Sequence, residues 1–274
     1  MRTHPALRTV QYAIACLFTV TSLYPIFLMV ASSFKNNLDI FREPFALPKS
    51  LDFSSYAKIF EDMPFLQYSK NSILVSAAVC LIVLLFGSMA SFYIARFRFW
   101  WNNALFMFFL LGMMIPIKLG IVPLFLQMKK MGIIDSLGSL IMVYSAMGIP
   151  MAVLIMSAFF RTLPKELEEA AKIDGATNAG ILLRIVIPLM RPALGTVLIF
   201  NFITAWNDFF FPLVFITDEM KKTIPVGMLS LFSQYSTNWN MVFAGLTLSS
   251  IPMIIIFFFA SRQFMEGLTA GAVK

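Results

Sequence analysis

Long apolar runs separated by short polar segments dominate the pattern of this chain. Crossing a hydrocarbon core of ~30 Å takes about 20 apolar residues in a helix. Four charge-free runs reach that length: residues 13–32, 72–95, 138–160 and 241–261. Two more runs, residues 104–127 and 193–217, each contain one internal charge. We therefore predict an all-α membrane protein with about six transmembrane helices and a single transmembrane domain over residues 1–274.

The two internal charges are Lys118 in the third run and Asp208 in the fifth. If both helices are regular, these residues lie ~21 and ~22 Å from the same side of the membrane. Opposite charges at one depth inside a bundle either pair or face a common aqueous cavity. The third run also contains Pro116, so we expect its helix to be kinked or interrupted and to face the protein interior.

Polar side chains gather among aromatic ones toward the end of the fifth run. They are Asn201, Trp206, Asn207 and Asp208. Amide and carboxylate groups beside flat aromatic faces suit the hydroxyls and the C–H surface of a sugar ring. With Lys118 they are candidates for a substrate path. Interhelical hydrogen bonding, worth ~0.6 kcal/mol on average in membranes, is the alternative role for such residues.

A long polar interruption, residues 161–192, separates the fourth run from the fifth. Pro164 suits the first turn of a helix, and the acidic residues after it suit the positive end of the helix dipole. Gly175 accepts the left-handed conformation that ends a helix. A second short helix, about residues 178–184, fits before Pro188 breaks the chain. We expect a narrow stripe on one side of the first helix, formed by Leu163, Leu167, Ala170, Ala171 and Asp174.

This segment resembles the EAA loop of binding-protein-dependent ABC importer permeases. The matching residues are Glu169, Ala170, Ala171, Asp174, Gly175, Ala176, Pro188 and Pro192. The resemblance implies that residues 161–192 form a cytoplasmic coupling loop whose helix inserts into a cleft of an ATPase subunit. The alternative is a solvated loop between two spans.

The end of the chain is similar to the cytoplasmic end of the second membrane subunit of maltose-type importers. The matching segment includes Gly267, Leu268, Thr269, Ala270 and Gly271. In that family the tail extends into the ATPase dimer, so the resemblance implies an ATPase contact here. It also implies three kinds of partner: a homologous permease subunit, two ATPase subunits that hold ATP and Mg, and an extracytoplasmic solute-binding protein.

Several chemistries have no signature in this sequence. There is no Gly-x-x-x-x-Gly-Lys-Ser/Thr loop for nucleotide phosphates, and His4 is the only histidine. Cys16 and Cys80 both fall within apolar runs, which indicates neither a disulfide framework nor a metal site. We expect a transport subunit without catalytic residues or a cofactor of its own. The net charge of +7 suits anionic lipid head groups and requires no nucleic acid.

The distribution of Lys and Arg orients the chain only weakly, with eleven on the side of both termini and nine on the other. The resemblance to the EAA loop therefore decides the orientation and places both termini in the cytoplasm, in a bacterial inner membrane. The expected function is ATP-driven import of a sugar or sugar derivative. The alternatives are an importer for a polyol or glycerol phosphate, or a secondary transporter driven by an ion gradient.

Overall fold

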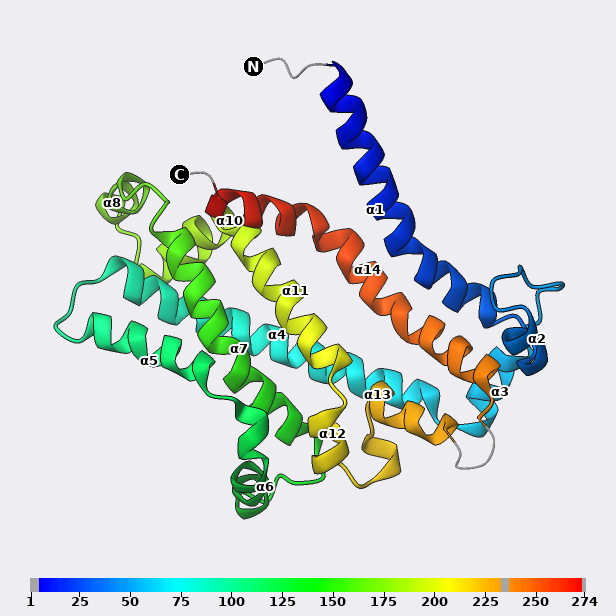
Figure 1. Ribbon diagram of the computed structural model, residues 1–274. Helices are drawn as coiled ribbons and strands as arrows, with labels where there is room; N and C mark the ends of the chain where they lie inside the picture. The colour runs from blue at the N-terminus through cyan, green and yellow to red at the C-terminus, as the bar shows by residue number, and fades with distance from the viewer. Residues whose placement is uncertain (1–4, 233–236, 273–274) are drawn as a thin grey trace. The chain divides into compact units, whose positions relative to one another are not determined.

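The computed structural model describes residues 5–232 and 237–272, and every regular element in those ranges is a helix (Figure 1). The predicted all-α class is confirmed. The chain divides into two compact units, one formed by Met1–Phe65 with Met228–Ile251 and the other by Leu66–Gly227 with Pro252–Lys274. The second unit contains the residues that the sequence singled out in the third to fifth apolar runs.

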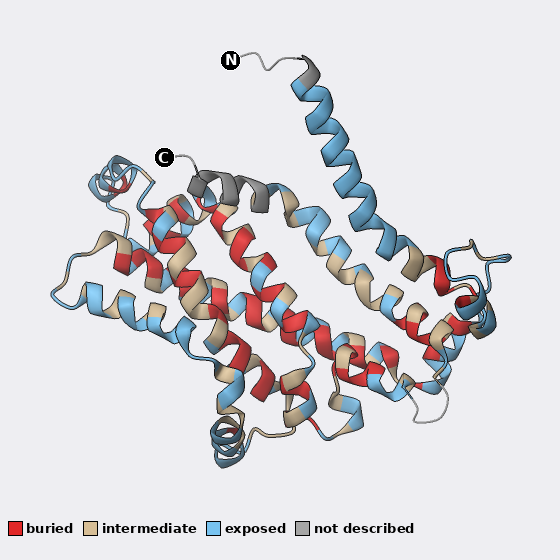
Figure 2. Cartoon of the chain, viewed as in Figure 1, coloured by how far each residue is buried: buried red, intermediate tan, exposed pale blue. Residues whose placement is uncertain are grey.

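The first unit contains a long apolar helix and short surface helices. Its elements are α1 (Pro5–Ser32), α2 (Asn37–Arg42), α3 (Ser54–Asp62), η4 (Met228–Leu231) and the start of α14 (Trp239–Ala272). Side chains along most of α1 are exposed, as the pale blue ribbon in Figure 2 shows. In α3, by contrast, Ile59 is fully buried while Phe60 is exposed, which is the amphipathic arrangement of a helix lying on a surface.

The second unit is built around helix α7 (Leu137–Phe160). Its other elements are α4 (Phe65–Arg96), α5 (Asn102–Met114), η1 (Ile117–Gly120), α6 (Ile121–Lys130), α8 (Glu166–Ile173), α9 (Asn178–Ile181), η2 (Leu182–Val186), α10 (Ile187–Leu189), α11 (Arg191–Asn207), α12 (Phe210–Phe215), η3 (Glu219–Lys221) and α13 (Ile224–Gly227). Helix α7 packs against both α5 and α11 (Figure 1). Its buried residues include Leu140, Val153 and Met156, so it forms the centre of the core.

Small residues allow the core helices to approach closely. A Cβ added to Gly87 of α4 would lie 2.7 Å from the Cβ of Ala152 in α7. Such a separation is shorter than real carbon contacts, so a larger residue would push the two helices apart. The hydroxyl of Ser91 donates to the Gly87 carbonyl at 2.6 Å, within the same small-residue surface. Close backbone approach of this kind is how helices associate in lipid, where burial of apolar surface gives little driving force.

Within the described residues, four helices are long and apolar enough to span a membrane: Leu7–Ser32, Phe65–Arg96, Leu137–Phe160 and Trp239–Gln263. Two bent helix pairs, Asn102–Met114 with Ile117–Lys130 and Asn178–Leu189 with Arg191–Asn207, raise the number to six if each counts as one span. The predicted count of about six is therefore reached. The expected interruption of the third run is confirmed, because α5 ends before Pro116 and a 76° bend follows. The fifth run is not one regular helix either, because α11 ends before Asp208.

The segment leading to α11 contains a π-helix, η2, that the sequence did not predict. A π-helix places one more residue in each turn than an α-helix does and is frequent at functional sites. Leu182 and Val186 at its two ends are buried. The expected break at Pro188 is also wrong in position. Pro188 lies inside α10, where its missing N–H is tolerated near a helix start, and the 81° bend follows at Met190.

Candidate functional site

Breaks in two spans place the charges of Lys118 and Asp208 next to each other. Helix α5 ends at Met114, and Lys118 lies in the short 3-10 turn η1 that follows the extended Ile115 and Pro116. The two halves of this run meet at 76°. Helix α11 ends at Asn207, and Asp208 adopts an extended conformation before α12 begins at Phe210. Both charged residues therefore lie on irregular backbone, as expected where a segment lines a cavity or packs in protein.

The two charges form an ion pair with a Lys118 Nζ to Asp208 Oδ1 distance of 3.3 Å. Of the two arrangements that their shared depth allowed, the structure shows the ion pair. The other carboxylate oxygen, Oδ2, accepts the Tyr144 hydroxyl at 2.9 Å and the Phe211 backbone N–H at 3.0 Å. Asp208 thus accepts hydrogen bonds from three donors in three elements, which offset the free-energy cost of placing its charge in a membrane.

The two members of the pair differ in exposure. The side chain of Asp208 is 12% exposed and that of Lys118 is 58% exposed. The Lys118 ammonium also lies 5.5 Å from the centre of the Phe210 ring, within range of a cation–π contact. Because Asp208 is fixed and Lys118 is accessible, a solute that reached the pair would meet the ammonium first.

A cavity of about 230 Å³ lies beside this network, between α4, α7 and α11. Its lining residues are Val79, Tyr144, Met147, Gly148, Met151, Phe200, Asn201 and Thr204. Tyr144 is shared by the cavity and the ion pair. Asn201 is buried, and its side-chain nitrogen donates to the Val197 carbonyl at 2.8 Å. A Cβ on Gly148 would overlap the Asn201 amide, so only glycine leaves room for that amide at the cavity wall.

The structure separates the remaining polar candidates of the fifth run from the ion pair. Trp206 is buried and its ring stacks on Phe202 with a centroid distance of 5.4 Å and an interplanar angle of 16°. Asn207 is exposed, and its amide lies 3.5 Å from the Met253 sulfur. Only Lys118 and Asp208 of the five candidates contact each other, while Asn201 joins them through the cavity that Tyr144 shares.

Tyr144 and Gly148 were missed by sequence reasoning. A single phenol within a charge-free run was an available signal, because a buried tyrosine hydroxyl usually finds a partner. No signal marked Gly148, since the need for glycine arises only when Asn201 of a distant helix packs against it. Tyr144, Gly148 and Asn201 come together because α7 packs against α11.

The polar segment after α7 forms the expected helix, turn and second helix. Helix α8 starts at Glu166 rather than at Pro164, and Gly175 follows it with φ +82°, the left-handed conformation predicted for it. Of the predicted stripe, Leu163 lies before α8, and Leu167, Ala170 and Asp174 are exposed. The buried residues of α8 are Glu168 and Ala171, whose spacing of three places them on one face.

The exposed side of α8 combines acidic and apolar residues. Ile173 is 86% exposed and Leu167 is 44% exposed, while Glu169 and Ala170 are also exposed. A cleft of about 470 Å³ lies between α8 and the next helices and is lined by Ala171, Asp174, Gly175, Ala176, Thr177, Gly180, Arg184 and Ile185. Pro188 lies outside this cleft and is exposed. Six of the seven predicted coupling residues, all but Pro188, therefore line the cleft or the turn beside it, or lie on the exposed face.

The predicted tail contact falls at the end of α14. The helix continues to Ala272, but the side chains of Gly267, Leu268, Thr269, Ala270 and Gly271 lie outside the described residues. Gln263 is the last residue of α14 whose surroundings are described, and its Cβ would be 2.5 Å from a Cβ on Gly195 of α11. The approach of α14 to α11 thus depends on the absence of a side chain at Gly195.

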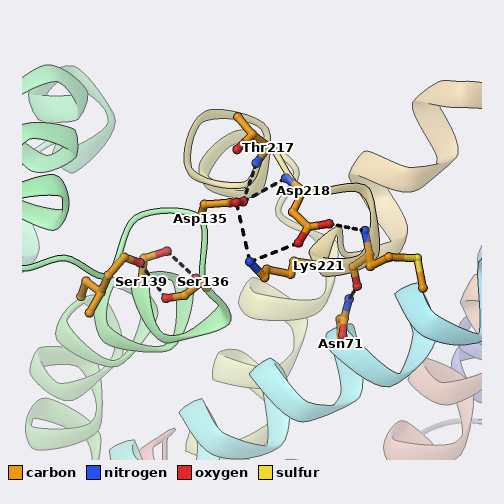
Figure 3. A network of polar contacts seen from close by, with 9 residues as sticks. Asn71, Asp135, Ser136, Ser139, Thr217, Asp218 and Lys221 are labelled. Carbon is orange, nitrogen blue, oxygen red and sulfur yellow. Dashed lines mark hydrogen bonds and ion pairs between the residues drawn. The ribbon is translucent and has the colours of Figure 1, made fainter.

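A polar network on the loops around α12 was not predicted (Figure 3). Asp135, at φ +55°, accepts the backbone N–H groups of Thr217 at 2.8 Å and Asp218 at 3.0 Å. Lys221 bridges the carboxylates of Asp135 and Asp218, at 3.7 and 3.1 Å. The hydrogen bond from the Asp218 N–H, then that from Thr217, and the nearby Lys221 charge hold the pKa of the Asp135 carboxyl below its usual range.

The same loop is fastened to the start of α4. The Asn71 amide donates to the carbonyls of Met220 at 2.9 Å and Lys222 at 2.8 Å. The Ser72 hydroxyl accepts the Ile224 N–H at 2.9 Å. Asp135 and Asn71 together anchor both sides of residues 217–224, a loop whose regular structure is the short 3-10 helix η3 and the first residue of α13.

Comparison with known proteins identifies similar chains along most of the length. A family model described as "Binding-protein-dependent transport system inner membrane component" matches residues 83–268. The probable ABC transporter permease protein YurM of Bacillus subtilis is 33% identical over 94% of this chain and 86% of that protein. The arabinooligosaccharides transport system permease protein AraQ of the same organism is 31% identical over 100% of this chain and 99% of its own length.

A solved structure has the same fold. It is the crystal structure of a bacterial ABC transporter involved in the import of the acidic polysaccharide alginate. One of its chains aligns with a TM-score of 0.82 and 23% sequence identity, over 96% of this chain and 98% of that one.

Proposed function

Because this chain belongs to the family of binding-protein-dependent transport system inner membrane components, we propose that it is the permease subunit through which an ATP-driven importer moves a sugar or sugar derivative. The observation that carries this proposal is the combination of an exposed, partly apolar helix α8 outside the spans with a polar network inside them. The first provides a surface for an energy-supplying partner. The second provides a path for a hydroxylated solute.

Two lines of support favour a sugar as the solute: what similar proteins are named for, and the polar groups that line the cavity in this chain. AraQ is named for arabinooligosaccharides, and the similar solved structure is an alginate importer. Within this chain, the cavity beside Tyr144 offers the amide of Asn201 and the hydroxyl of Thr204 among apolar walls. Few polar groups placed in a mainly apolar pocket are what fix the orientation of a small polar ligand. We propose Lys118, Asn201 and Asp208 as residues of the solute path, with Trp206 and Asn207 supporting the end of α11.

We propose residues 161–192 as the coupling loop to an ATPase subunit. Glu169, Ala170 and Ile173 form the exposed face of α8, and Ile173, at 86% exposed, offers a partner an apolar contact. Asp174, Gly175 and Ala176 form the turn that ends this helix. Ala171 is buried within the chain, so its small size serves close packing of α8 rather than contact with the ATPase. Pro188 acts at the base of the loop.

The remaining parts of the proposal concern orientation and partners. We place α8 and both termini in the cytoplasm of a bacterium, because an ATPase that holds ATP and Mg must meet α8 there. A homologous permease subunit and two ATPase subunits complete the complex, and the binding protein delivers solute on the opposite side. The tail at 267–271 approaches the ATPase. The whole chain acts as one transmembrane domain, and ATP hydrolysis takes place on the partner.

The test is solute uptake by the chain with and without its partners. Proteoliposomes that contain the complete complex and its binding protein are expected to take up one member of a panel of neutral and anionic oligosaccharides only when ATP is enclosed. The panel member is chosen by measuring binding to the isolated binding protein. Uptake by this chain alone along a sodium or proton gradient would overturn the proposal in favour of a secondary transporter.

A further inference from the structure

Helix α8 is fastened to a span that is distant in sequence. Arg96 is the last residue of α4, and its Nε lies 2.5 Å from Oε1 of Glu168 in the first turn of α8. The same guanidinium donates through another nitrogen to the Leu163 carbonyl at 3.0 Å. Arg96 therefore holds both the entry to α8 and its first turn, using the fixed fork geometry that a lysine lacks.

The pair is buried although it lies at the edge of the protein. The side chain of Arg96 is 5% exposed and that of Glu168 is 8% exposed. Removing two charges from water is expensive, and a well-packed apolar pair of similar volume is often at least as stable. Stability alone is thus a weak reason for this arrangement. A buried guanidinium that bonds both Glu168 and the Leu163 carbonyl does fix the position of α8 relative to the end of α4.

A second contact fastens the same face of α8. The Lys172 ammonium lies 5.9 Å from the ring centre of Phe97, the residue that follows α4. Lys172 is four positions after Glu168, so both contacts are made from one side of the helix. Phe97 in turn packs on Tyr93 of α4 with stacked rings 4.8 Å apart. The exposed face of α8, with Glu169 and Ile173, is left free for a partner.

From this geometry we propose that Arg96 and Glu168 are positioning residues that make the end of α4 and helix α8 move as one body. This inference rests on the proposed function, because it takes the exposed face of α8 as the surface that an ATPase displaces. Displacement of α8 would then reach α4 directly through the buried pair. The covalent connections of α8 lead only to α7 and α9.

The experiment measures the distance between α8 and α4 in the assembled importer with both ATPase subunits. Spin labels are attached at Lys165→Cys, beside α8, and at Leu85→Cys, on the exposed side of α4, with Cys16 and Cys80 replaced by alanine. Electron–electron distance distributions are recorded without nucleotide and with Mg and AMP-PNP. With Arg96 and Glu168 present, we expect the two distributions to coincide.

Three variants test the pair. Glu168→Gln and Arg96→Gln are each expected to shift or broaden the distribution when AMP-PNP binds, and the double variant is expected to match the single ones because all three remove one interaction. Arg98→Gln, at an exposed site two residues along, is the matched control and should leave the distributions coincident. Arg96→Lys replaces Arg96→Gln if the latter does not assemble.

The outcomes separate this inference from the proposed function. If the ATPase subunits co-purify with each variant and the distance stays independent of nucleotide, the pair does not link the helices and the inference is wrong. Loss of the ATPase from Glu168→Gln alone would also overturn it, because the pair would then serve docking. Failure of the ATPase to co-purify with the unaltered chain would instead contradict the proposed coupling loop.

Discussion

The hydroxyl of Tyr144, in the first half of α7, donates to Oδ2 of Asp208 at 2.9 Å, at the point where α11 ends. This bond ties the central helix of the core to a break in a neighbouring span. It leaves Oδ1 of Asp208 with Lys118, whose side chain is more than half exposed. The carboxylate is therefore held firmly on one side and by an accessible cation on the other.

The unequal exposure of the ion pair predicts unequal effects of removing its members. Lys118→Leu leaves the carboxylate of Asp208 buried without a counter-charge, and we expect a loss of up to about 3 kcal/mol of stability. Asp208→Asn leaves an exposed ammonium and retains a side-chain acceptor for Tyr144 and Phe211, so its loss should be smaller. Thermal unfolding of the purified complex measures both.

Uptake then distinguishes a structural pair from a solute contact. If Lys118 meets solute, Lys118→Leu changes the preference between neutral and anionic oligosaccharides in the assembled importer, after correction for protein amount. Wild-type uptake and unchanged preference in Lys118→Leu would remove Lys118 from the proposed path.

Gly148→Ala tests the wall of the cavity. The added methyl group would overlap Asn201 and also lie 2.8 Å from Val83, so the amide must move into the cavity. We expect a destabilisation of about 1–3 kcal/mol, as for other overpacked cores, together with reduced uptake. Gly112→Ala is the matched control, because its Cβ would meet Pro150 at an ordinary 3.5 Å. Equal behaviour of the two variants in uptake and thermal unfolding would contradict this account.

Gly175→Ala tests the turn after α8. Both Gly175 and Gly132 have positive φ with nothing within 4 Å of an added Cβ, so alanine adds backbone strain but no clash at either position. The cost should be about 1 kcal/mol for each. Only Gly175→Ala is expected to weaken co-purification of the ATPase, as is the charge reversal Glu169→Lys. Normal ATPase recovery in Glu169→Lys would contradict the coupling-loop proposal.

The lowered pKa of Asp135 predicts a pH dependence in acid. Its carboxylate is favoured in the folded state by the N–H groups of Asp218 and Thr217 and by Lys221. The stabilisation is complete above the unfolded pKa of about 3.9 and is lost as pH falls through the lower folded value. Unfolding temperature between about pH 5 and 3 should fall less steeply in Asp135→Asn than in the unaltered chain. Identical slopes would show that the network in Figure 3 does not favour the charged form.

Features encoded locally were predictable from the sequence. The apolar runs predicted the spans because crossing a bilayer requires a minimum length of apolar residues, and the shared depth of Lys118 and Asp208 predicted either an ion pair or a common cavity. The structure shows the ion pair although neither helix is regular, because each break lies within a few residues of its charged residue. The burial of Glu168 could not be predicted, since its partner Arg96 lies 72 residues away. Likewise, Gly148 is needed only because of Asn201.

The π-helix Leu182–Val186 limits how the length of this chain can change during evolution. Deleting one residue there could restore ordinary α-helical hydrogen bonding at little local cost. The same deletion would leave the rotation across the segment nearly unchanged, because five π-helical residues turn the chain about as far as four α-helical ones. A one-residue deletion within α11 has no surplus residue to remove, so it would rotate one side of that helix by about 100° relative to the other.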